Sequence, residues 1–97
     1  MSYLNLPPLP EVLTHDQAAH WCDSARAVLR QIAPDAGAKV LQLDAGALSQ
    51  FDSSALAALL VLRREAAALG HTLLVQQLPS RARELATLYG VSELLAS

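Results

Sequence analysis

The clearest structural signal in the chain is Asp52-Ser-Ser-Ala-Leu-Ala-Ala-Leu-Leu-Val-Leu-Arg-Arg-Glu-Ala-Ala-Ala-Leu-Gly70. Asp and Ser favour a helix start because their side-chain oxygens accept backbone N–H groups, and glycine is typical just past a last turn. The stretch therefore predicts a helix over residues 54–69. Its first two turns are apolar all round, although a helix that flanks a sheet needs an apolar stripe only about 100° wide. The excess indicates either deep burial or a surface that another protein covers, and we favour the partner surface.

Two apolar runs lie on either side of this helix and predict strands. The first is Lys39–Asp44 and the second is His71–Gln77. Both are mostly apolar at their centres, which is typical of strands that are covered on both faces in a parallel sheet. Residues 45–50, with Phe51 at the end, form a connection between the first strand and the helix.

Further helices precede and follow these elements. Thr14-His-Asp-Gln17 fits a capping box, in which the Thr and Gln side chains satisfy backbone N–H groups at a helix start. Apolar residues then recur at three- and four-residue steps up to Ile32, which predicts an amphipathic helix that Pro34 ends before a loop over 35–38. Residues 81–89 predict a third helix, and residues 91–95 predict a last helical turn.

The first part of the chain, SYLNLPPLPEVL over residues 2–13, contains three prolines. Proline cannot donate to a central ladder, so residues 1–11 are predicted to be an extended arm or an edge strand. Residues 3–6 or 12–13 are the segments that pair with a sheet. Strands that alternate with helices imply right-handed crossovers. We therefore expect a single α/β domain over 1–97, with a largely parallel or mixed sheet of about 3–4 strands flanked by 3–4 helices.

Composition excludes several classes of function. The chain has 97 residues, a net charge of −2 and a single lysine, Lys39, which argues against binding nucleic acid through a basic patch. The longest apolar run, Ala55–Leu62, is far shorter than the ~20 residues of a membrane span, so we expect no membrane insertion. No signal peptide is expected, and the lone Cys22 cannot form an internal disulfide, which makes the cytosol the default location.

The sequence offers no convincing catalytic, metal or cofactor site. A nucleophile elbow of the form Gly-x-Ser-x-Gly is absent, as is a glycine-rich phosphate loop. The three histidines, His15, His20 and His71, have no spacing that pairs them with Ser53 or that makes a metal site. We interpret Cys22 as a core residue because it shares the apolar helical spacing of its neighbours.

One polar cluster stands out, namely Asp52-Ser53-Ser54 at the start of the central helix. It is either a plain helix cap or a site whose hydroxyls face outward at a helix N-terminus. Unpaired N–H groups and the positive end of the helix dipole meet there, so a phosphoryl group or an anionic partner group is favoured electrostatically.

With this motif, the order of elements resembles that of a STAS domain over roughly residues 12–95. The resemblance rests on Phe51-Asp-Ser-Ser-Ala-Leu56, on Leu69-Gly-His71 before the second strand, and on the ending Leu85-Ala-Thr-Leu-Tyr-Gly-Val-x-x-Leu-Leu95. The family includes anti-sigma-factor antagonists, tails of anion transporters and a small cytoplasmic subunit of the Mla phospholipid ABC transporter. It usually opens with a two-strand hairpin, for which the proline-rich arm leaves little length.

Of these members, the Mla-type subunit is the most similar, through the apolar Ala55 after the Asp52-Ser-Ser54 motif, a very short N-terminal portion and the run Leu88-Tyr-Gly-Val91. This resemblance implies a non-catalytic regulatory subunit without cofactors, which binds the transporter's ATPase and is thereby held peripherally at the inner membrane. Lipid movement between the inner and outer membranes would depend on it. The resemblance implies that Ser53 contacts the ATPase, with rim and packing contacts from Asp52, Ser54, Ala57 and Val61, and a surface completed near Arg81 and Glu84.

The alternative within the family is an anti-sigma-factor antagonist. Such proteins typically read Asp-Ser-Ser-Gly-Leu, and a partner kinase phosphorylates the first serine. That serine corresponds to Ser53 here, while Ala55 occupies the glycine position. A homodimer of the isolated chain through the apolar helix is a further open alternative.

Overall fold

A computed structural model describes residues 2–32 and 37–95, and it confirms the predicted α/β class. The elements follow the order β1 (Ser2–Asn5), β2 (Val12–Leu13), α1 (His15–Arg30), β3 (Lys39–Asp44), β4 (Gln50–Phe51), α2 (Ser53–Ala68), β5 (Thr72–Gln76), α3 (Ser80–Leu88) and α4 (Ser92–Leu95). The predicted helices and strands are present with shifts of one or two residues at their ends. Pro34 and the first half of the loop predicted over 35–38 lie outside the described residues.

The sheet is parallel throughout. β3 lies between β1 and β5, with Tyr3 opposite Val40 and Leu41 opposite Leu73. Beyond β1 the chain keeps following β3, because the backbone N–H groups of Leu6 and Leu9 donate to carbonyls of β3. The prolines occupy this irregular edge segment, where a missing N–H costs little.

Farther along the same two segments, β2 pairs with β4, also in parallel, with Val12 opposite Gln50. The sequence correctly suggested that Val12–Leu13 could pair, but it assigned Gln50 to a connection, which was wrong. Two residues are too few to establish an alternating pattern. The strand exists because the backbone N–H groups of Ser49 and Gln50 both donate to the carbonyl of Glu11.

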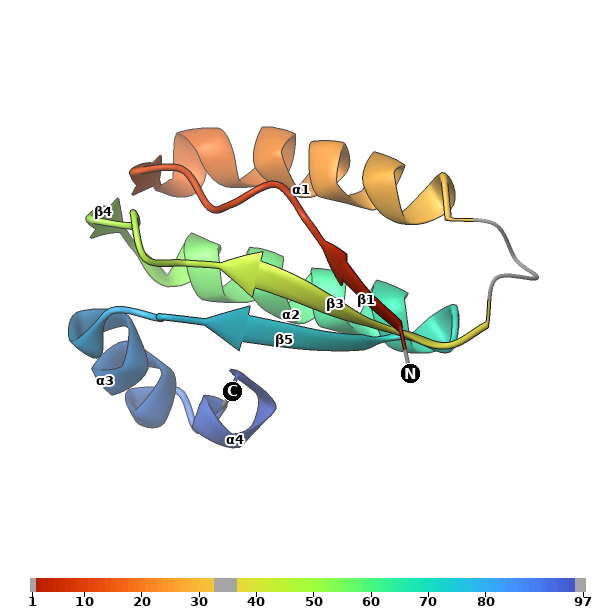
Figure 1. Ribbon diagram of the computed structural model, residues 1–97. Coiled ribbons are helices and arrows are strands. Elements are labelled where there is room, and N and C mark those ends of the chain that lie inside the picture. The colour runs from red at the N-terminus through yellow and green to blue at the C-terminus, as the bar shows by residue number, and fades with distance from the viewer. Residues whose placement is uncertain (1, 33–36, 96–97) are drawn as a thin grey trace.

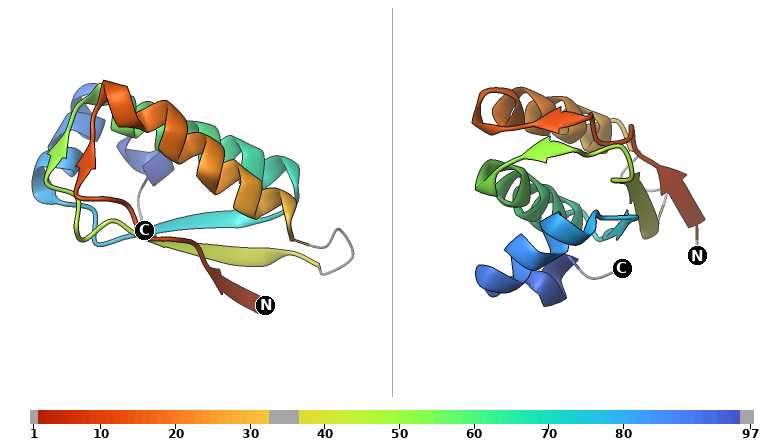
Figure 2. Two further views of the ribbon diagram at one scale, coloured as in Figure 1. Left: turned by 90° about the horizontal axis from the view of Figure 1, so that it is seen from above. Right: turned by 90° about the vertical axis from the view of Figure 1, so that its left-hand side faces the viewer.

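All four helices lie on one side of the three-stranded sheet in the described part of the chain (Figures 1 and 2). α1 and α2 run side by side across the sheet, and α3 and α4 lie next to α2 on the side away from α1. The expectation of strands covered on both faces is therefore wrong. The sheet grows in one direction from β1 to β5, so two right-handed crossovers place both helices on the same face.

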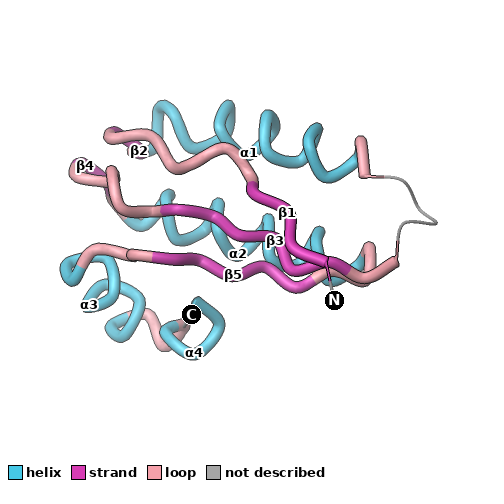
Figure 3. The backbone as a smooth tube through the Cα atoms, in the orientation of Figure 1, coloured by secondary structure: helices cyan, strands magenta, loops and turns pink. Residues whose placement is uncertain are grey.

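The core lies between this covered face and the helices. Its largest fully buried side chains are all leucines: Leu9, Leu13, Leu29, Leu41, Leu43, Leu59 and Leu62. The chain path in Figure 3 shows why α2 contributes so much to it, since the helix runs between α1, the sheet and the α3–α4 pair. Burial on three sides accounts for much of the apolar excess of α2. What is left outside is a narrower strip, in which Ala57 is exposed and Leu60 and Val61 are half-buried.

Candidate functional site

The polar centre of the site is the carboxylate of Asp52, which joins the starts of two helices. One oxygen, Oδ1, accepts the backbone N–H of Ser54 at 2.8 Å and so caps α2. The other, Oδ2, accepts the backbone N–H of His15, the first residue of α1, at 3.0 Å. Both N–H groups lack partners inside their own helices. Asp52 is therefore a cap, as the sequence indicated, and it also holds α1 and α2 together.

These contacts change the acidity of Asp52. Desolvation opposes its charged form, but the hydrogen bonds from the backbone of Ser54 and of His15 favour that form more strongly. The Ser54 side chain and the charge of His15 add to the effect, and together they lower the pKa of Asp52 below its ordinary value. The bridge between the helices is thus an ionised carboxylate at neutral pH.

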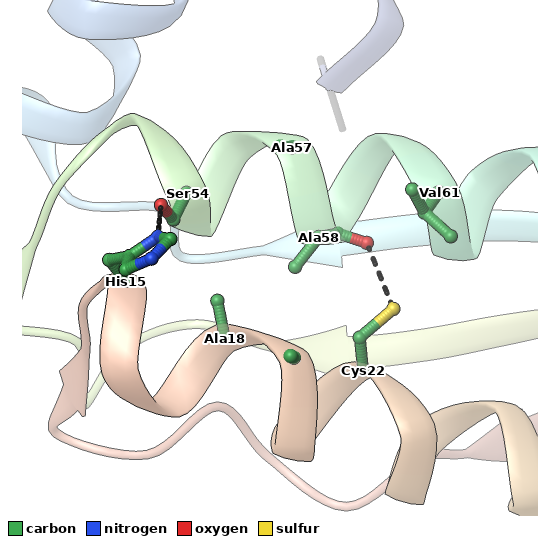
Figure 4. Close-up of a pocket in the computed structure, with 8 residues that line it drawn as sticks. His15, Ala18, Cys22, Ser54, Ala57, Ala58 and Val61 are labelled. Atoms are coloured by element: carbon green, nitrogen blue, oxygen red, sulfur yellow. Dashed lines mark hydrogen bonds between the residues drawn. The ribbon is translucent and has the colours of Figure 1, made fainter.

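The two serines of the motif differ in their surroundings. Ser53, the first residue of α2, is exposed, whereas Ser54 is half-buried and its Oγ lies 3.5 Å from Nδ1 of His15 (Figure 4). No spacing in the sequence paired a histidine with Ser53, and in the structure His15 lies beside Ser54. His15 is a site residue that sequence reasoning missed, because the contact spans two helices far apart in the chain.

A groove of about 270 Å³ lies between α1 and α2, next to the contact of His15 with Ser54. His15 and Ser54 close one end, and an ion pair of 2.7 Å between Arg26 and Glu65 links the two helices farther along. Each of these two pairs is separated by 39 residues, so the two helices run parallel in matched register. The groove is lined by small and apolar residues: Ala18, Ala19 and Cys22 from α1, and Ala57, Ala58 and Val61 from α2.

Cys22 forms part of the lining of this groove (Figure 4). It is buried, and its Sγ lies 4.0 Å from the carbonyl oxygen of Ala58. Burial raises the pKa of the thiol; Arg26 opposes that change, and Asp23 and Glu65 reinforce it. The prediction of a core cysteine is confirmed, since the group stays protonated and packs between the helices.

On the other side of Ala57 a second hollow of about 330 Å³ lies between α2 and the end of α3. It is lined by Ser53, Leu56, Ala57, Leu60, Tyr89 and Val91. Tyr89 is 60% exposed, and Leu88, which precedes it in the chain, is 83% exposed. In the sequence, Tyr89 and Val91 belonged only to the C-terminal motif that resembles a family, and no pattern placed them at the site.

Ala57 lines both hollows, and Ser53, one turn before it, lines the second. These two residues form a ridge on α2, with Val61 on the side of α1. The predicted site residues fall together here, although Asp52 and Ser54 serve mainly to hold the helices. Arg81 lies near the motif, with its guanidinium 5.9 Å from the ring centre of Phe51. Glu84 instead lines a separate hollow on α3 with Ser80, Arg83 and Thr87.

The remaining histidines have other surroundings. His71 is buried and accepts the backbone N–H of Lys39 through Nδ1 at 3.1 Å, which holds the start of β3 beside β5. His20 is exposed on α1. Over residues 2–32 and 37–95 no three His, Cys, Asp or Glu side chains gather in a way that could hold a metal ion. No helix in the same ranges has the length and apolar character needed to cross a membrane.

Comparison with known protein families gives a match over most of the chain. A family model described as "Mlab, STAS domain" matches residues 10–96, which include the Asp52 motif, both hollows and the ridge. A search of curated protein sequences finds no match to the chain.

Proposed function

The chain belongs to the STAS family described as "Mlab, STAS domain", and on that premise we propose that it is a non-catalytic accessory subunit that binds the ATPase of a phospholipid-moving ABC transporter. Membership of this family supports an accessory or regulatory role in general. STAS domains typically mediate protein–protein interaction and are generally non-catalytic. The ATPase, the lipid cargo and a location at the inner membrane through the complex are parts of the proposal.

The observation that carries the proposal is the ridge of Ser53 and Ala57 between two apolar hollows. Small side chains on an exposed helix allow the backbone of a partner to approach closely, and hollows on both sides accept apolar side chains from it. The exposed ring of Tyr89 adds to the apolar surface of the second hollow. A contiguous apolar surface of this kind is typical of a protein-binding site.

The geometry of the polar groups supports binding in preference to catalysis. The distance between Ser54 Oγ and His15 Nδ1 is 3.5 Å, which is longer than the 2.6–3.2 Å typical of a nucleophile and its base. The Asp52 carboxylate accepts two backbone N–H groups and so orients helices, whereas in a triad it would orient the imidazole. The hydroxyl of Ser53 is the more accessible of the two, and it lies on the ridge.

Co-expression with the cognate ATPase subunit tests the proposal. We expect the two proteins to purify together and to elute as one complex from a sizing column. Ser53→Glu places a charge on the ridge, and we expect the complex to be lost. The fold should be retained, because an acidic residue in the first turn of a helix is favourable for that helix. Ser24→Glu on an exposed part of α1 is the matched control and leaves the complex intact. An ATPase that assembles and works equally well without this chain refutes the proposal.

The second candidate is an anti-sigma-factor antagonist that is switched by phosphorylation of Ser53. The observation in its favour is that the Ser53 hydroxyl is exposed in the first turn of α2, where the helix dipole favours a phosphate. Intact-mass measurement after incubation with the cognate kinase and ATP tests it. The added phosphate should be absent in Ser53→Ala and present in Ser54→Ala; a wild-type chain that gains no phosphate rules this function out.

A further inference from the structure

The ridge continues along α2 to a positive charge. Residues at three- and four-residue steps lie on one stripe of a helix, and the stripe that begins at Ser53 and Ala57 passes Leu60 and Val61 and reaches Arg64. Leu60 and Val61 are half-buried, whereas Arg64 is exposed. At a rise of about 1.5 Å per residue, Arg64 lies about 10 Å beyond Ala57 along the helix axis. The outward stripe thus has an apolar part followed by a cationic part.

The arginines near this end of α2 have different partners. Arg26 reaches from α1 to Glu65 and makes an ion pair of 2.7 Å. No ion pair or side-chain hydrogen bond joins Arg63 or Arg64 to another residue in the described ranges. An exposed arginine is ordinary on a protein surface. What distinguishes Arg64 is its alignment with the two hollows, since Arg63 points about 100° away around the helix.

We propose that the outward stripe of α2 binds a helix of the partner whose apolar side chains fill the two hollows and whose acidic side chain pairs with Arg64. The proposal rests on the proposed function, because the partner is taken to be the ATPase subunit. A helix fits because the ridge is straight and has hollows on both sides, so side chains at i and at i+3 or i+4 enter one hollow each. An acidic residue on that helix compensates the guanidinium when both leave water, and a planar carboxylate matches the fork of an arginine.

An anionic membrane surface is the other occupant with this chemistry, and the charges on the neighbouring helix α1 argue against it. Asp16 and Asp23 are exposed on α1, and the chain as a whole has a net charge of −2. These carboxylates repel anionic headgroups, whereas one acidic side chain on a protein helix meets Arg64 locally.

The test measures the affinity of the full chain for the cognate ATPase subunit in three variants. We expect Arg64→Ala to weaken binding about threefold to tenfold and Arg64→Glu to weaken it more than about tenfold. Arg63→Glu, the matched control on the same helix, should change binding less than about twofold. The difference in affinity between the Arg64 variants and the wild-type chain should become smaller as the salt concentration rises from about 0.05 to 0.5 M.

The outcomes separate the two ideas. If the wild-type chain does not bind the ATPase, the proposed function fails and the inference fails with it. If the wild-type chain binds but the Arg63 and Arg64 reversals have equal effects, the inference fails and the proposed function stands. Vesicles of anionic phospholipid provide the other arm. Wild-type binding to these vesicles that both reversals weaken equally identifies a membrane surface as the occupant and overturns the inference.

Discussion

The substitution Ala57→Glu probes the ridge directly, because it separates stability from binding. Ala57 is exposed in the free chain, so a longer polar side chain there reaches water without displacing core atoms. Glu is also a good helix former. We therefore expect the free energy of unfolding to change by less than about 0.5 kcal/mol, as is usual for surface substitutions. In the complex with the ATPase subunit, the carboxylate that Ala57→Glu introduces lies between two apolar hollows and has no ion-pair partner.

The size of the effect on binding follows from that position. A charge left unpaired in a buried environment costs about 3–5 kcal/mol. The lower end applies because Ala57 stands on the ridge and not inside either hollow. About 3 kcal/mol corresponds to binding that is roughly a hundredfold weaker. Ala27→Glu is the matched control, since Ala27 is exposed on α1 and lies on the opposite side of that helix from Ala18 in the groove.

Titration calorimetry with the ATPase subunit gives the affinities, and urea unfolding gives the stabilities. The expected pattern is a large loss of affinity for Ala57→Glu alone, with both variants as stable as the wild-type chain. Equal affinities for the two variants would refute the assignment of the ridge. A loss of stability greater than about 1 kcal/mol in Ala57→Glu alone would show that Ala57 packs in the core and that the binding result has another cause.

Two further predictions concern the polar bridge and the thiol. The pKa of Asp52 is lowered in the folded chain, so the stability that its ionised form contributes is present above the unfolded-state pKa and is lost as the pH falls through the folded-state pKa. The urea midpoint of the wild-type chain should therefore drop more steeply below about pH 4 than that of Asp52→Asn. Parallel plots of midpoint against pH would contradict the bridge. Cys22 has a raised pKa and is buried, so iodoacetamide should modify it far more slowly in the folded chain than in urea, and more slowly still when the ATPase covers the groove. Equal rates with and without the ATPase would place the interface elsewhere.

The sequence predicted the main elements because their patterns are long. The α2 stretch has a cap, a run of apolar residues and a glycine stop, and Gly70 indeed adopts a positive φ at the end of the helix. The strands β3 and β5 are mostly apolar at their centres. The β2–β4 pairing is two residues long, and the irregular segment between β1 and β2 contains the prolines. Such pairs depend on where the rest of the fold places the chain, which is information that no local pattern contains.

The candidate site was predictable only where it depends on a local pattern. Asp52 was a candidate cap because an aspartate precedes the apolar helical run, and its contact with Ser54 is local, but its second acceptor contact, to His15, spans 37 residues. The hollow beside Tyr89 likewise exists only because α3 and α4 pack next to α2. The apolar excess of α2 was overinterpreted for the same reason. Most of those side chains are covered by elements whose positions the sequence does not specify.

The matched register of α1 and α2 links the motif to the surface on which it lies. Asp52 fixes the start of α2 against the start of α1, and the Arg26–Glu65 ion pair fixes the same register about three turns later. The groove between these two restraints is lined by small and apolar residues of both helices. The polar contacts at Asp52 and at Arg26 therefore hold the helices together on either side of it. A change at Asp52 should alter binding through the spacing of the helices even though its carboxylate faces backbone N–H groups, which explains why an acidic residue and an exposed serine are adjacent in one motif.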